Sequence, residues 1–315
     1  METPSHTFSA NGKLLLTAEY AVLFGALALA LPARRGQRLT VTYGQKDGLL
    51  SWTSRELGKD WFSASLRLPG LEVISSSNAA LALRLSSLLQ TVRQLSPDFL
   101  HTSRGAAVIT DLDFPRDWGL GTSSTLIHLV SQWSGTDPYA LLDATFGGSG
   151  YDIACAERNM PILYQREQGR VRIQATRFNP PFLDCLFLGF SGVKKDSGQE
   201  VRRVLQHGAF PGSVISRLSE ISTLITQCTD LKDFISLMQE HEQLLGIQLG
   251  QEVVCMRFPD HDGLVKSLGA WGGDFLLFSW EGPQDELRMR LGRDRVGPVF
   301  SLDELLYTHE PTNGV

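Results

Sequence analysis

The sequence is poor in the residues from which disulfide and metal frameworks are built. Four cysteines occur in 315 residues, far apart and without a CxxC pair, so no disulfide framework is expected. Seven histidines are scattered along the chain, and none belongs to an HExxH pattern, so no structural metal is predicted. We interpret the cysteines as reduced thiols packed in the core rather than as nucleophiles.

The chain also lacks an excess of positive charge and a segment that fits a membrane span or a signal peptide. Its formal net charge of −5 argues against a general nucleic-acid-binding protein. The longest apolar stretch, residues 14–31, contains Glu19, is interrupted by Gly25 and follows no basic region. The stretch therefore fits neither a membrane span nor a signal peptide. We predict a cytoplasmic protein that binds neither nucleic acid nor membranes.

What is present is the composition of a folded protein of about two domains. Apolar residues make up 42% and charged residues 20% of the chain. A turn at Asn11 and Gly12, alternating segments and helices with one apolar face predict a mixed α+β fold. Strands are predicted at residues 13–16, 38–43, 49–53, 61–68, 106–111, 162–164, 171–175, 182–190 and 275–280 and near Val299. Helices are predicted at residues 79–95, directly after 121, at 138–146, about 150–159, 198–207, 212–227, 230–249 and 284–291, with a turn-plus-helix element at 19–25.

Residues 118–125 (WGLGTSST) bring glycines and hydroxyls together at a predicted helix start. Because Gly119 and Gly121 have no Cβ, the backbone there can approach a bulky anion. Thr122 and Ser123 stand where free N–H groups and the helix dipole favour a phosphate group, and a hydroxyl at this place suits a metal ion. An ordinary capped helix after a tight loop is an equally good interpretation of this stretch by itself.

Other segments of the chain strengthen the phosphate interpretation. Residues 11–25 (NGKLLLTAEYAVLFG), 115–124 (PRDWGLGTSS) and 269–278 (GAWGGDFLLF) resemble, in order and spacing, the three motifs of the GHMP kinases. That family is named after galactokinase, homoserine kinase, mevalonate kinase and phosphomevalonate kinase. Residues 148–154 (GSGYDIA) resemble the element with the catalytic aspartate in the mevalonate kinase branch, and contain the GYDIA pentapeptide of a bacterial subgroup. Residues 191–201 (SGVKKDSGQEV) resemble a further segment of the family.

The resemblance implies a two-domain GHMP kinase fold. Residues 1–181 would form a ribosomal-S5-like domain with the phosphate loop and the catalytic aspartate, and residues 182–315 a ferredoxin-like domain, with ATP and the acceptor bound between them. Pro180 and Pro181 are the predicted hinge. No GxxxxGK[ST] sequence occurs, so the phosphate loop is not of the Walker type.

The resemblance also implies the cofactors ATP and Mg²⁺ and a small-molecule alcohol as acceptor. Asp152 would accept or orient the proton of the acceptor hydroxyl, and Lys13 would neutralise charge at the transferred phosphoryl group. Glu19 would contact the substrate or support Lys13. Lys194 and Ser197 would meet an anionic group of the substrate, or simply form a solvated helix start. The expected cofactor-binding residues are Gly119, Leu120, Gly121, Thr122, Ser123 and Ser124, with the Ser123 hydroxyl on Mg²⁺.

Several positions depart from the family pattern. Leu141 stands where mevalonate kinases carry a second magnesium carboxylate, with Asp143 as a substitute two residues later. Trp271 interrupts the third glycine segment, and Asp274 replaces a small neutral residue near phosphate groups, which a carboxylate would repel. Ala18 replaces a glycine.

Three functions therefore stay open. The favoured one is an ATP-dependent kinase for an alcohol such as mevalonate or a related hydroxy acid. The alternatives are a non-catalytic nucleotide- or metabolite-binding protein and an enzyme resembling diphosphomevalonate decarboxylase. A homodimer is the candidate assembly.

Overall fold

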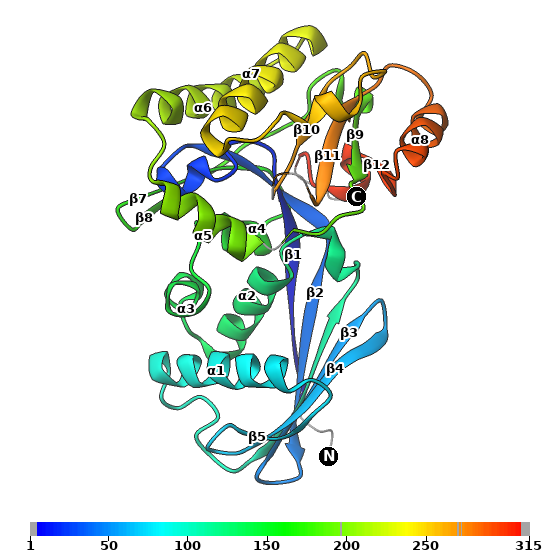
Figure 1. The fold of residues 1–315 in the computed structure, drawn as a ribbon. Helices are drawn as coiled ribbons and strands as arrows, with labels where there is room; N and C mark the ends of the chain where they lie inside the picture. The colour runs from blue at the N-terminus through cyan, green and yellow to red at the C-terminus, as the bar shows by residue number, and fades with distance from the viewer. Residues whose placement is uncertain (1–4, 196, 270, 272, 310–315) are drawn as a thin grey trace, which may run out of the picture. The chain divides into compact units, whose positions relative to one another are not determined.

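The computed structural model describes residues 5–195, 197–269, 271 and 273–309 and divides the chain into two compact units (Figure 1). The first unit consists of Met1–Gly12, Arg35–Arg116 and Gly121–Glu157. The second consists of Lys13–Arg34, Asp117–Leu120 and Arg158–Val315. The expected domain boundary after residue 181 stays a prediction.

The described residues form a mixed α+β fold, as predicted, with one large and one small sheet. The strand order is β5-β4-β3-β6-β2-β7-β8 in the large sheet, where β1 pairs with β2, and β10-β11-β9-β12 in the small one. The strands are β1 Ser5–Leu15, β2 Ala28–Gln45, β3 Leu49–Glu56, β4 Lys59–Arg67, β5 Glu72–Ser76, β6 Gly105–Leu112, β7 Ile162–Glu167, β8 Arg170–Ala175, β9 Leu186–Phe190, β10 Val265–Ser267, β11 Phe275–Ser279 and β12 Val299–Ser301. The helices are α1 Ala79–Leu95, α2 Thr122–Ser134, α3 Pro138–Thr145, α4 Tyr151–Ala156, α5 Ser197–His207, α6 Gly212–Ile225, α7 Leu231–Leu249, α8 Gln284–Arg293 and α9 Leu302–Leu305, with 3-10 turns η1 Ala21–Phe24, η2 Arg116–Trp118, η3 Leu183–Cys185 and η4 Val254–Arg257.

In the first unit, helices α1, α2 and α3 gather on one side of the strands (Figure 1). Strand β3 runs parallel to β6, whereas β3–β4, β4–β5 and β2–β6 are antiparallel. Helix α1 begins after Asn78, whose side chain accepts the Leu81 N–H, and its buried residues recur at helical spacing. They pack with strand residues such as Trp52 and Val108 into one apolar core. Buried residues of α2 belong to the same core, so the position of α2 is fixed by this packing.

In the second unit, the small sheet is antiparallel in all its pairs. Its core joins Phe278 of β11 and Leu287 of α8 with other buried apolar residues. Helix α7 is capped by Asp230, which accepts the N–H groups of Lys232 and Asp233, and it ends at Gly250 with φ +62°. Strand β10 carries Lys266, and α7 carries His241 and Glu242.

Two local predictions were wrong. No turn occurs at Asn11 and Gly12, because β1 runs unbroken from Ser5 to Leu15 and buries its second half. Tertiary pairing therefore overrides the turn preference of this dipeptide. The strand predicted at residues 182–190 begins only at Leu186, after the 3-10 turn η3.

The apolar stretch at residues 14–31 is divided among the end of β1, the turn η1 and the start of β2. Gly25 ends η1 with φ +91°, a left-handed conformation that glycine adopts readily. Within the described ranges, none of the helices combines the length and apolar character that a membrane span needs.

Candidate active site

The predicted phosphate loop enters helix α2 in the first unit. Gly121 precedes the helix with φ +93°, and its carbonyl accepts the Thr125 N–H at 2.9 Å. Since glycine has no side chain to cap the first turn, the N-terminus of this 13-residue helix is suited to an anion. The side chains of Thr122 and Ser124 are half-buried, and Ser123 is exposed. Glycine, hydroxyl groups and the helix N-terminus therefore occur together at this point of the chain, and their binding of phosphate stays a prediction.

Asp152 lies beside this helix start. Helix α4 begins after Gly150, which has φ +84°, and carries Asp152 in its first turn. The Ser124 hydroxyl donates to Asp152 Oδ2 at 2.6 Å. A hydrogen bond to a carboxylate is strong and directional, so it fixes the orientation of the acid. The fold thus joins the predicted catalytic aspartate to the predicted phosphate loop.

Lys13 is held against the other end of the glycine segment, within the second unit. Its Nζ donates to the Gly119 carbonyl at 3.1 Å, and its backbone N–H donates to the Leu120 carbonyl at 3.0 Å. Next to Gly119, the Trp118 ring meets Phe275 and Phe300 edge-on at 5.9 and 5.3 Å between centroids. The ammonium group is consequently fixed to the glycine segment although 106 residues separate Lys13 from Gly119.

The third glycine segment brings a carboxylate to the same glycine. A Cβ atom at Gly119 would overlap the carboxyl group of Asp274, so only glycine fits there. The Asp274 N–H donates to the Val193 carbonyl and the Ser191 N–H donates to the Asp274 carbonyl, both at 2.8 Å. Ala270 and Gly272 of this segment lie outside the described residues.

The predicted substrate residues of the segment at 191–201 are less defined. Lys194 is exposed, three residues before helix α5 begins at Ser197. The Ser197 side chain lies outside the description. Their assignment to an anionic substrate group stays a prediction, as do the other assigned roles.

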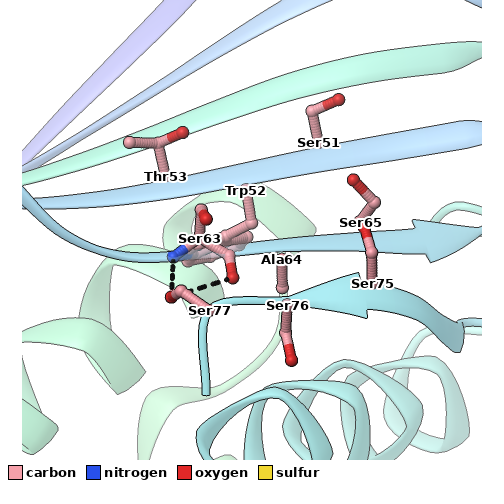
Figure 2. Close-up of a pocket in the computed structure, with 9 residues that line it drawn as sticks. All are labelled: Ser51, Trp52, Thr53, Ser63, Ala64, Ser65, Ser75, Ser76 and Ser77. Atoms are coloured by element: carbon pink, nitrogen blue, oxygen red, sulfur yellow. Dashed lines mark hydrogen bonds between the residues drawn. The ribbon is translucent and has the colours of Figure 1, made fainter. Parts of the chain in front are cut away.

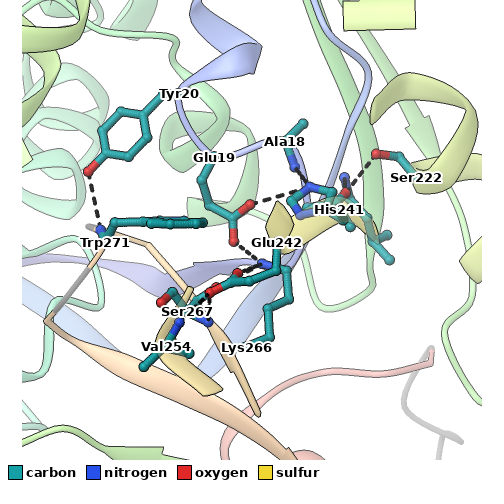
Figure 3. Close-up of polar contacts among 12 residues, drawn as sticks. Ala18, Glu19, Tyr20, Ser222, His241, Glu242, Val254, Lys266, Ser267 and Trp271 are labelled. Carbon is teal, nitrogen blue, oxygen red and sulfur yellow. Dashed lines mark hydrogen bonds and ion pairs between the residues drawn. The ribbon is translucent and has the colours of Figure 1, made fainter. Parts of the chain in front are cut away.

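Glu19 occupies a buried charged cluster in the second unit (Figure 3). Its side chain is 1% exposed, and Oε1 accepts a hydrogen bond from Lys266 Nζ at 2.5 Å. The other oxygen, Oε2, lies 3.5 Å from His241 Nε2. Burial raises the pKa of Glu19 to about 7, while the Lys266 ammonium acts in the opposite direction.

His241 and its neighbours fix the backbone around Glu19. His241 Nε2 accepts the Ala18 N–H at 2.7 Å, and burial and then the Lys266 charge hold its pKa well below the usual range. The neutral imidazole is therefore the acceptor. Ala18 and Tyr20 both have positive φ, 61° and 60°, which is unusual for residues with a Cβ. The Tyr20 hydroxyl in turn accepts the Trp271 N–H at 3.3 Å.

Glu242 closes the cluster from the next position of α7. Its Oε1 accepts the Ser267 N–H at 3.2 Å, and its Oε2 lies 4.0 Å from Lys266 Nζ. Burial raises the pKa of Glu242. The family resemblance assigns Glu19 to the substrate or to Lys13, whereas the structure pairs it with Lys266 and places its second oxygen beside the neutral His241.

Sequence reasoning did not select Lys266 or Glu242. The signals were a lysine within the apolar run LVKSLG and acidic and imidazole side chains on the inner stripe of an amphipathic helix. Of these, His241 is fully buried. Charged side chains are rarely buried without a partner, so a lysine or glutamate at an inward-facing position indicates an ion pair.

No group of three or more His, Cys, Asp or Glu side chains is placed to hold a metal ion in the described part of the chain. Leu141, at the position of the family's second magnesium carboxylate, is buried in α3, and Asp143 on the same helix is exposed. The exposed Ser123 hydroxyl and the Asp152 carboxylate offer oxygen donors, which suit Mg²⁺ that retains waters and phosphate ligands.

A separate hollow lies on strands β3, β4 and β5 of the first unit (Figure 2). Its lining is mostly hydroxyl groups, and none of the lining residues is charged. The residues are Ser51, Trp52, Thr53, Ser63, Ala64, Ser65, Ser75, Ser76 and Ser77. The lining contains no counterpart of the Asp152 carboxylate or the Lys13 ammonium group.

Comparison with known proteins identifies the architecture. No family model matches the sequence, and no curated protein matches it. Solved structures do match over almost the whole chain. The Streptococcus pneumoniae phosphomevalonate kinase, in complex with phosphomevalonate and AMPPNP, is 18% identical, with a TM-score of 0.69 over 94% of this chain and 100% of that one.

Two further kinases match in the same way. The Methanococcus jannaschii mevalonate kinase is 17% identical, with a TM-score of 0.66 over 95% of this chain and 97% of that one. The Lactococcus lactis galactokinase, solved with galactose, is 9% identical, with a TM-score of 0.64 over 96% and 93%. The chain has the GHMP kinase fold. At these identities the likeness establishes that fold and leaves the activity to the chemistry of the site.

Proposed function

We propose that this chain is an ATP-dependent kinase that transfers the γ-phosphoryl group to the hydroxyl of a small molecule, with a mevalonate-like hydroxy acid as the favoured acceptor. The observation that carries the proposal is the Ser124–Asp152 hydrogen bond beside the N-terminus of α2. It places an oriented carboxylate next to a helix start suited to phosphate. The mevalonate, phosphomevalonate and galactose kinases with this fold support the reaction class.

The chain's own groups divide the work of phosphoryl transfer. Backbone N–H groups from Gly119 to Ser124 hold phosphate oxygens, with Leu120 buried as the anchor of the turn. Asp152 accepts the proton of the acceptor hydroxyl, and its bond to Ser124 keeps the accepting oxygen in place. Lys13, held at the Gly119 carbonyl, offsets negative charge on the transferred group.

Magnesium fits this arrangement through the Ser123 hydroxyl. When bound with the nucleotide, Mg²⁺ would supply charge neutralisation at the phosphate oxygens. The buried Leu141 side chain provides no ligand, so the protein contributes few donors of its own.

The test is turnover of a substrate panel by the purified chain. Mevalonate, phosphomevalonate, galactose and homoserine are incubated separately with Mg-ATP, and ADP formation and CO₂ release are followed. Acceptor-dependent ADP without CO₂ supports the kinase. Acceptor-dependent ADP with CO₂ would support a decarboxylase, and no turnover of any member would contradict the proposed acceptor class.

A non-catalytic nucleotide-binding protein is the second candidate, because the buried Asp274 carboxyl group abuts Gly119. Calorimetric ATP binding without turnover of any panel member would favour it.

A further inference from the structure

Asp274 stands at the meeting point of two glycine segments of the second unit. Gly119 and Gly269 have almost the same positive φ, 67° and 68°. A Cβ at Gly119 would overlap the Asp274 carboxyl group, and a Cβ at Gly269 would lie 3.2 Å from its Oδ2. Both glycines therefore leave room for this one side chain.

Backbone hydrogen bonds and burial together define the position of Asp274. Asp274 has φ +53°, a conformation that aspartate and asparagine tolerate better than most residues. Its N–H and carbonyl groups are hydrogen-bonded to Val193 and Ser191, and the residue is 2% exposed. The backbone bonds fix the Cα of Asp274 beside β9, and the close packing around the buried side chain keeps its carboxyl group against Gly119.

The position of the carboxylate has an electrostatic consequence for anions at Gly119. Lys13 Nζ donates to the Gly119 carbonyl, so a cation and an anion border the same residue. In a site with little water the repulsion between like charges is stronger than in bulk solvent. A nucleotide with bound Mg²⁺ carries less negative charge than the free nucleotide, so the carboxylate opposes the free form more.

We infer that Asp274 is a specificity-determining residue that makes the phosphate loop select the metal-bound nucleotide over the free nucleotide. The inference rests on the proposed function, because it assumes that nucleotide phosphates bind at Gly119. The inference explains why this chain has a carboxylate at position 274, where the family resemblance leads us to expect a small neutral residue.

The experiment compares ATP affinity with Mg²⁺ and with EDTA by calorimetry, in the wild-type chain and in Asp274→Asn. Asparagine keeps the shape and tolerates the same φ but removes the charge. We expect the affinity for free ATP to rise about tenfold or more, and the affinity for Mg-ATP to change less. Asp274→Gly, a small neutral residue suited to positive φ, should give the same result.

Asp285→Asn is the matched control, since it makes the same change in net charge at an exposed carboxylate of α8 that pairs with Arg288. It should leave both affinities unchanged, and thermal unfolding should show that all variants fold. An unchanged or lower affinity for free ATP in Asp274→Asn and Asp274→Gly would overturn the inference while leaving the kinase proposal intact. Absence of any ATP binding by the folded wild-type chain would overturn both.

Discussion

The first cluster, Asp152 with Ser123 and Ser124, and the second cluster, Glu19 with His241, Glu242 and Lys266, differ in their access to solvent. In the first unit, Asp152 of α4 is half-buried and accepts a hydrogen bond from Ser124 of α2, a helix on which Ser123 is exposed. In the second unit, Glu19 and Lys266 are buried, at 1% and 0% exposure, and form an ion pair through Glu19 Oε1.

The difference in solvent access suggests different roles for the two clusters. A carboxylate that keeps partial access can meet a substrate hydroxyl, whereas a buried ion pair acts on the backbone around it. Around Glu19 that backbone carries the positive φ angles of Ala18 and Tyr20, and His241 accepts the Ala18 N–H. We therefore expect substitutions in the first cluster to change turnover and substitutions in the second to change stability.

The largest effect is expected for Asp152→Asn. The change keeps the size of the side chain and removes the proton acceptor, so kcat for phosphoryl transfer should fall about 100- to 10,000-fold. The measurement is ADP formation with the best acceptor of the panel, together with the midpoint of urea unfolding, which should stay within experimental error.

Asp98→Asn is the control for Asp152→Asn, because Asp98 is an exposed aspartate of the same unit outside the candidate site. It should retain full activity. Equal activity of Asp152→Asn and wild type would show that another group accepts the proton.

Lys266→Met should give the largest loss of stability. The substitution leaves Glu19 buried without its cation, and breaking such a pair costs roughly 3–5 kcal/mol. Urea unfolding measures the loss. The double variant Glu19→Gln with Lys266→Met should recover part of it, since no unpaired charge of this pair remains; a double variant less stable than Lys266→Met would argue against the pair.

The pH dependence of stability tests the burial of Glu19. Because the pKa of Glu19 is raised from 4.5 to about 7 in the folded protein, the folded state binds more protons than the unfolded state between these values. The contribution of this group to the free energy of unfolding therefore falls as pH rises through that window. Glu242 acts in the same direction, and His241, with its lowered pKa, in the opposite one.

Comparison with Glu19→Gln isolates the Glu19 contribution. From pH 5 to pH 8 the variant should gain on the order of 1–3 kcal/mol relative to wild type. Urea unfolding at both pH values gives this difference, and a difference that does not change with pH would contradict a raised pKa.

The smallest effect is expected for Ser124→Ala. Loss of one hydrogen bond to a carboxylate removes about 1.5–3 kcal/mol at most, so kcat should fall about tenfold while the protein stays folded. Thr136→Ala, on the same unit after α2, serves as the control. If Ser124→Ala matched wild type in kcat, the Ser124 bond would have no part in orienting Asp152.

Much of the fold was accessible from local patterns, while the buried cluster was not. Apolar residues at helical spacing predicted α1 and α7, and glycine with hydroxyls predicted the start of α2. The Glu19–Lys266 pair joins positions 247 residues apart, and no local preference encodes such a contact. The predicted turn at Asn11 failed for the same reason, because pairing between distant strands outweighed it.

The placement of the site residues follows the same division. The motifs selected Asp152 and Lys13, and the structure supplied their partners Ser124 and Gly119. The sequence showed the charge of Asp274 as a departure from the family pattern. It did not predict that the Asp274 carboxyl group lies against Gly119, because the two residues are far apart in the chain.

The most direct test of phosphoryl transfer is a ³¹P NMR time course of the wild-type chain with Mg-ATP and each acceptor of the panel. The kinase account predicts that the γ-phosphate resonance of ATP decays as a phosphoester resonance of one acceptor grows, and that Asp152→Asn suppresses both changes. A spectrum in which ATP stays intact with every acceptor, or in which only inorganic phosphate forms, would contradict it.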